Sequence, residues 1–100
     1  MKSSKKSRKP THPGAILRED VLPALNISQT ELAMRLGVSR LTVSELLHEK
    51  RAVSPDMAIR LARLLNTTPE SWLNMQQSLD IWELEQRGKR KYANIETFTV

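Results

Sequence analysis

Apolar side chains recur along this chain three or four residues apart, in runs separated by short segments of turn and capping residues. This spacing places the apolar side chains of each run on one face of an α-helix. The runs predict five helices, at about residues 13–22, 29–36, 40–48, 55–65 and 70–87. The residues expected to face the core are Ile16, Leu17, Val21, Leu32, Ala33, Leu36, Val43, Leu46, Leu47, Met57, Leu61, Leu64 and Leu65. With no convincing strand, the pattern predicts an all-α fold.

Four of these helices are preceded by a residue that favours the N-cap position. The four residues are Ser28, Ser39, Ser54 and Thr68. Glu31 follows Ser28 at the spacing of a capping box, in which the hydroxyl covers the third amide and the carboxylate reaches back to the cap amide. Gly37 favours the left-handed conformation that ends a helix. Pro23 predicts a kink or an end of the first helix near residue 22.

The composition changes at both ends of the chain. Residues 1–11 are rich in Lys, Ser and Arg and predict a flexible basic arm. Residues 12–87 are expected to form one helix-turn-helix domain, in which residues 69–87 are a C-terminal dimerisation helix. Residues 88–100 are basic and then rich in β-branched side chains, and the sequence leaves their structure undetermined.

Residues 28–48 carry the parts of a helix-turn-helix: a short capped helix, a glycine turn and a second capped helix. Ala33 is small where the two helices cross, Gly37 accepts the positive φ of the turn, and Val38 fills the corner. With the apolar face of the second helix turned inward, its outer face carries Arg40, Leu41, Ser44 and Glu45. The alternative is a two-helix turn in an ordinary bundle.

The net charge of +5 is unevenly distributed. Residues 1–12 carry five cations and no acid, and residues 87–91 carry four more cations. Residues 13–86 hold seven basic and ten acidic side chains, so the positive charge belongs to the two ends. Basic segments favour polyanions, because each neutralised phosphate releases counterions. A solubilising, disordered arm is the alternative.

Several classes of function are excluded by residues that the chain lacks. It has no Cys, and His12 and His48 have no partner at helical spacing, so neither a disulfide nor a metal site is predicted. A phosphate-cradling glycine loop and a buried pair of carboxylates are also missing. No apolar run approaches the roughly 18–20 residues of a membrane span, and no signal peptide is visible. We expect a cytoplasmic protein without enzymatic activity, cofactor or metal.

Short motifs in the helical region resemble two related families. Residues 29–33 (QTELA), 37–39 (GVS) and 43–44 (VS) resemble the helix-turn-helix of phage repressors, the Cro/C1 or XRE type. Residues 12–17 (HPGAIL) and 68–76 (TPESWLNMQ) resemble the HigA antitoxin family, also called VapI-like. The helix-turn-helix combination is more specific than a lone glycine motif.

The resemblance extends over about residues 12–86, with Met75 where the family pattern often has Leu. It implies a lambda-repressor-like fold and a bacterial antitoxin that represses its own operon as a homodimer. It also implies a partner, a toxin of RelE-like fold that cleaves mRNA on the ribosome. Two alternatives stay open: a free-standing transcriptional regulator without a toxin, and a protein-interaction module whose helix-turn-helix surface binds a protein.

The outer face of the second helix supplies the candidate contacts to DNA bases. Arg40 can pair bidentately with guanine O6 and N7, and its alternatives are a phosphate contact or a solvated side chain. Leu41 either touches a thymine methyl group or fills the seam between helices. Glu45 either accepts from cytosine N4 or disfavours wrong sites, and Ser44 lies on the same face.

Five further residues are candidate phosphate contacts. Gln29 begins the supporting helix, where the family resemblance implies a phosphate contact and the helix N-terminus favours one. Ser39 and Thr42 are placed similarly, although capping alone explains Ser39. Lys50 and Arg51 follow the recognition helix and are expected to meet a phosphate, with a solvated loop as the alternative.

The last helix carries the candidate dimer interface. Its stripe consists of Trp72, Met75, Leu79 and Trp82. Two tryptophans ten residues apart on one helix span about 15 Å, which is more than a small helical core can cover. The simpler alternative is that both tryptophans complete the core of a single chain. We expect instead that the second half of the helix forms a homodimer seam.

Overall fold

The structure is a computed structural model that describes residues 8–99, and this part of the chain contains helices and no strand. In chain order the elements are α2 (Pro13–Ile16), the π-helical η1 (Leu17–Val21), α3 (Leu22–Leu25), α4 (Gln29–Leu36), α5 (Arg40–Leu47), α6 (Pro55–Leu65), α7 (Pro69–Arg87) and α8 (Lys89–Ala93). The first three follow one another without a break, so the five predicted helices are confirmed. α8 lies in the segment that the sequence left undetermined. Residues 1–7 of the predicted arm lie outside the described residues.

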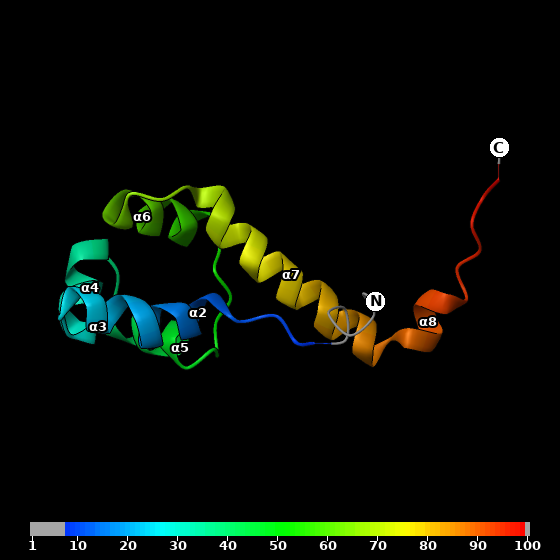
Figure 1. The fold of residues 1–100 in the computed structure, drawn as a ribbon, viewed down its shortest axis with the longest axis horizontal. Coiled ribbons are helices and arrows are strands. Elements are labelled where there is room, and N and C mark those ends of the chain that lie inside the picture. Colours follow the sequence, from blue (N-terminus) through cyan, green and yellow to red (C-terminus); the bar gives the residue numbers. More distant parts are fainter. Residues whose placement is uncertain (1–7, 100) are drawn as a thin grey trace.

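Helices α2 to α6 form a bundle at one end of the molecule, and α7 projects from it as a long rod (Figure 1). α8 lies at the far end of α7, so the molecule is elongated, with extents of 51 × 27 × 23 Å. The segment before α2 runs beside α7, where Lys9 Nζ lies 3.8 Å from Glu83 Oε2. The helix-turn-helix and the C-terminal end of α7 are therefore at opposite ends of the molecule.

The core lies inside the bundle. Its buried residues are Leu17, Leu32, Ala33, Leu36, Val43, Leu46, Leu47, Val53, Met57, Ala58, Leu61 and Trp72. Ile16, Val21, Leu64 and Leu65 are partly buried and pack against this cluster. All residues expected to face the core are therefore confirmed. The burial of these apolar side chains is the main force that holds α2 to α6 together.

The first helix is longer than predicted, because Pro23 neither ends nor interrupts it. The helix continues to Leu25 and ends at Asn26, which has a left-handed backbone (φ 56°). A proline inside an α-helix removes a hydrogen bond and collides with the carbonyl four residues earlier. Here the widened π-helical turn of η1 comes directly before the proline, and Leu22 N–H donates to Leu17 C=O, five residues back. The wider turn gives the proline ring the room that a regular α-helical turn lacks.

The predicted N-caps are confirmed, but the capping box is only half formed. Each cap hydroxyl accepts a hydrogen bond from the amide three residues later, over 3.0–3.2 Å, at Ser28, Ser39, Ser54 and Thr68. The expected return bond from Glu31 to the amide of Ser28 is wrong for the described chain. The Glu31 carboxylate instead accepts from Arg35 Nη2 (2.7 Å) and Nε (2.9 Å). An arginine one turn away offers this carboxylate two charge-assisted bonds, which are stronger than one bond to an amide.

Candidate nucleic-acid interface

The turn between α4 and α5 has the geometry that the sequence predicts. Gly37 is left-handed (φ 74°, ψ 34°), and its N–H donates to Met34 C=O over 3.2 Å. Val38 N–H donates to Ala33 C=O over 3.0 Å. These two bonds form a Schellman motif, which satisfies carbonyls that the end of α4 would otherwise leave free. The motif fixes the direction in which the chain enters α5.

A residue outside the motif also holds this turn. Arg60, on α6, donates from Nη1 to Leu36 C=O over 2.8 Å and lies 3.4 Å from Gly37 C=O. Its Nε is bonded to Asp56 Oδ2 over 2.9 Å, which orients the guanidinium. This role of Arg60 could not be predicted from the sequence, because an arginine on the next helix carries no local signal for it.

α5 is locked by its inner face and exposes its outer face. Val43, Leu46 and Leu47 are buried in the core. Arg40 and Leu41 are exposed at the first turn of α5. A concave surface joins this turn to the start of α4, and its lining residues are Ser28, Gln29, Thr30, Arg40, Leu41 and Ser44. The structure thus brings one predicted phosphate contact beside three predicted base contacts.

Leu41 is 66% exposed, which argues against one of its two predicted roles, that of filling the seam between helices. A side chain that filled the seam between helices would be buried, as Val43 is. Leu41 therefore projects outward and is available for an apolar contact, such as that with a thymine methyl group.

The other predicted contacts lie outside this concave surface. Ser39 Oγ is 2.9 Å from Thr42 Oγ1 and accepts from the Thr42 amide, so both hydroxyls are engaged in the cap. Glu45 accepts from Arg51 Nη2 over 2.7 Å and from Arg51 Nε over 3.0 Å. This pair partly neutralises an acid on the outer face of α5. Lys50 is exposed in the loop that follows α5.

The first helix, α2, packs against the C-terminal end of α5. This contact also could not be predicted from the sequence. Gly14 packs so closely on α5 that an added Cβ would lie 1.8 Å from Leu46 O. His12 caps α2, and its Nδ1 accepts from the Gly14 amide over 2.8 Å. The His-Pro-Gly signature at residues 12–14 therefore has a packing role, because only glycine allows this approach.

Arg18 completes the contact with the end of α5. Its Nη1 donates to Leu47 C=O over 2.6 Å and to Glu49 Oε2 over 3.3 Å, and its Nη2 donates to Glu19 Oε2 over 2.7 Å. The hydrogen bond to Glu19, with a smaller contribution from Glu49, raises the pKa of Arg18 above its ordinary value. The positive guanidinium lies beside the negative end of the α5 dipole, an arrangement that stabilises the end of this helix.

The tryptophan stripe divides into two parts along α7. Trp72 is 4% exposed, belongs to the core cluster and donates from Nε1 to Thr67 Oγ1 over 2.8 Å. Met75 is partly buried against the same cluster, whereas Leu79 is buried outside it. Trp82 is half-buried, and its Nε1 is buried with no hydrogen-bond partner among the residues described. The stripe is thus divided between the core of the bundle, at Trp72 and Met75, and a separate position further along α7, at Leu79 and Trp82.

Two expected absences concern metals and membranes. Within residues 8–99, no three His, Cys, Asp or Glu side chains come together in a way that could hold a metal ion. No described helix is both long and apolar enough to cross a bilayer.

Known proteins match this chain over most of its length. Residues 17–73 match the helix-turn-helix family. A helix-turn-helix-type transcriptional regulator of Haemophilus influenzae is 40% identical over 91 residues, which cover 89% of this chain and 85% of the relative. Antitoxin HigA-1 of Vibrio cholerae is 39% identical over 83 residues, covering 83% and 78%. The solved structure of Pseudomonas aeruginosa antitoxin HigA with the higBA promoter has a TM-score of 0.85 at 36% identity, and the match covers 91% of this chain and all of that one.

Proposed function

This chain belongs to the helix-turn-helix family, and on that premise we propose that it is a HigA-type antitoxin that represses its own operon by reading operator DNA with α5. The observation that carries the proposal is the concave outer surface shared by α4 and α5, which presents Gln29, Arg40 and Leu41 together. The relatives named as an antitoxin and as an antitoxin with a promoter support it. We place its action on DNA in the bacterial cytoplasm, where no catalysis, metal or cofactor is needed.

The mechanism assigns different tasks to the residues of this surface. Arg40 and Leu41 reach base edges in the major groove, one by a bidentate hydrogen bond and one by an apolar contact. Gln29, at the first turn of α4, contacts a phosphate and sets the register. Ser44 and Glu45 lie further along α5, and Lys50 and Arg51, in the loop that follows this helix, meet the phosphate backbone.

The test compares specific with random DNA, using the region upstream of the gene as the source of the operator. Arg40→Ala should weaken operator binding by about 1–3 kcal/mol and binding to random DNA much less. Arg63→Ala removes a cation that is exposed on α6 and is the control for net charge. Equal losses on both DNAs would reduce Arg40 to a phosphate contact, and no preference for any upstream sequence would overturn the proposal.

A homodimer is the second part of the proposal. One recognition helix contacts few base pairs, whereas a dimer reads two half-sites about one helical turn apart. We propose that the seam lies around Trp82 on the second half of α7, where the neighbouring apolar side chains of Ile81 and Leu84 are 48% and 47% exposed. Leu79 is 3% exposed, so it supports this part of α7 from inside the chain.

The toxin is the third part, and it is tested separately. The gene next to this one should encode a small protein of RelE-like fold, and the two proteins should co-purify when expressed together. If no such neighbour exists, the chain is a free-standing regulator, and the DNA-binding part of the proposal is unaffected.

A further inference from the structure

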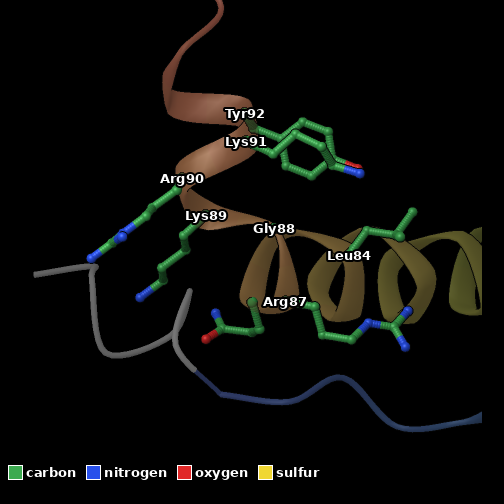
Figure 2. Close-up of a pocket in the computed structure, with 8 residues that line it drawn as sticks. Leu84, Arg87, Gly88, Lys89, Arg90, Lys91 and Tyr92 are labelled. Carbon is green, nitrogen blue, oxygen red and sulfur yellow. The ribbon is translucent and has the colours of Figure 1, made fainter.

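Four cations gather at the opposite end of the molecule from the helix-turn-helix. They come from the last residue of α7 and the first turn of α8, on either side of Gly88 (Figure 2). The four cations are Arg87, Lys89, Arg90 and Lys91. They border a groove of about 530 Å³, whose other lining residues are Leu84, Gln86, Gly88 and Tyr92. None of these lining residues is acidic. This distal cationic groove has no role in the proposed reading of the operator.

The joint between the two helices gives the groove its shape. Gly88 N–H donates to Leu84 C=O over 2.8 Å, which ends α7, and Gly88 C=O accepts from Tyr92 N–H over 3.0 Å, which begins α8. Gly88 therefore makes the last hydrogen bond of α7 and the first of α8, at the point where the chain changes direction. Lys89 and Arg90 project away from α7, and Lys91 lies along the ring of Tyr92 (Figure 2). The Lys91 Nζ is 5.3 Å from the ring centroid, a cation–π contact that holds this side chain.

The charges of the groove are unbalanced, whereas most arginines of the bundle are paired. Within the bundle, four arginines each pair with a carboxylate: Arg18, Arg35, Arg51 and Arg60. Within the described chain, no ion pair involves the four cations of the groove, and all four are exposed. The segment before α2 brings Lys9 to the same end of α7, through its contact with Glu83. Like charges gathered in this way repel one another until an anion neutralises them.

We propose that the distal cationic groove binds the phosphate backbone of duplex DNA outside the base pairs that α5 reads. The inference deepens the proposed function and rests on it in one respect, that the chain works on DNA. The argument is charge complementarity: the groove has four exposed, flexible cations at its rim and no acidic lining residue, and phosphate contacts need little more than such cations.

The length of the molecule limits where this phosphate lies. The long axis measures 51 Å, which equals about 15 base pairs at 3.4 Å each. The groove therefore reaches either the flank of the same duplex within that distance or the backbone of a second duplex. Both sites offer the same phosphate chemistry, and an experiment that varies the length of the DNA distinguishes between them.

The main experiment uses the full chain and a random-sequence duplex, so that it does not depend on the operator. Binding is measured over a series of salt concentrations for the wild type, Arg90→Gln and the control Arg63→Gln. The slope of log Kobs against log salt is negative, and removing one phosphate contact decreases its magnitude by about 0.9. We expect that decrease for Arg90→Gln and no change for Arg63→Gln, although both variants remove one charge from an exposed side chain.

The triple variant Lys89→Gln, Arg90→Gln and Lys91→Gln amplifies the effect, with an expected decrease in the magnitude of the slope of about two to three. Circular dichroism checks that the helix content is kept. A second arm uses operator duplexes with and without about 15 flanking base pairs. If the triple variant binds more weakly than the wild type only to the flanked duplex, the groove contacts the same DNA as α5. If the wild type binds two duplexes at once and the triple variant binds only one, the groove contacts a second duplex.

An unchanged salt slope in both Arg90→Gln and the triple variant would overturn the inference and would favour an acidic protein as the partner of the groove. This failure is distinguishable from failure of the proposed function. The salt slope on random DNA requires no sequence preference, and the Arg40→Ala comparison requires no contact at the groove.

Discussion

The two ends of this molecule differ in how their large exposed apolar side chains are distributed. In the bundle, large exposed apolar residues occur singly, one on each of four helices: Leu25, Met34, Leu41 and Ile59. From the second half of α7 onward they gather within a short stretch: Ile81, Leu84, Tyr92, Ile95 and Phe98. Single exposed apolar residues are ordinary on protein surfaces, whereas their higher density along the distal segment makes this end the expected place for association.

The difference indicates how each end acquires its structure. The helix-turn-helix end is complete within one chain, because Gly14, Arg18 and Arg60 fix both ends of the motif from outside it. At the distal end, the last turns of α7 and the short α8 extend beyond the bundle, and large apolar side chains there are exposed. Substitutions in the first region should therefore change stability, and those in the second should change association.

The largest expected effect is that of Gly14→Ala. Its Cβ would lie 1.8 Å from the carbonyl oxygen of Leu46, so α2 and α5 would have to separate. Overpacking of this kind costs about 3 kcal/mol, measurable as a lower free energy of unfolding in urea. Gly88→Ala is the matched control at the distal end, where the nearest atoms are the Tyr92 ring at 3.0 Å and Leu84 O at 3.2 Å. Equal destabilisation by the two variants would remove the distinction between the regions.

Trp82→Ala should have the next largest effect, and on association. A central aromatic residue at an interface is worth about 2 kcal/mol or more, equivalent to at least about a 30-fold weaker dimer. Sedimentation should show monomers at concentrations where the wild type is dimeric, with helix content largely kept. Operator binding should fall at low protein concentration and recover as the concentration rises.

Ile59→Ala is the control for this variant, because it removes an exposed apolar residue from α6 in the bundle. If Trp82→Ala unfolds the chain, Trp82 belongs to the core of the monomer. If the variant is folded and still dimeric, the seam lies elsewhere.

Arg60→Met should lower the free energy of unfolding by about 1 kcal/mol, because it removes the donor to the end of α4 while keeping most of the apolar stem. Arg63→Met changes an exposed arginine on the same helix that makes no ion pair within the described chain, and it should have no such effect. The measurement is urea unfolding of both variants. If they unfold alike, the bond from Arg60 to Leu36 C=O contributes nothing to the motif.

Leu41→Ser should have the smallest effect on stability, within about 0.5 kcal/mol, because the side chain is exposed. It should nevertheless weaken binding to the operator more than binding to random DNA. A clear decrease in stability would show that Leu41 supports the bundle and is not free for a base contact.

Most of the helix-turn-helix could be predicted from the sequence because its signals are local. The caps at Ser28 and Ser39, the left-handed Gly37 and the buried faces of α4 and α5 all depend on residues within a few positions of one another. Periodicity and capping act over this range, so the pattern determined the fold class, the turn and the exposed position of Arg40.

The tertiary structure alone decided the contacts between residues far apart in the chain. It placed Gly14 against Leu46, Arg18 on Leu47 and Arg60 on Leu36, and it assigned Trp72 to the core but not Trp82. Each of these contacts joins residues on different helices or depends on how α7 leaves the bundle. Local propensity has no information about such distances, because the packing of whole helices determines which side chains meet.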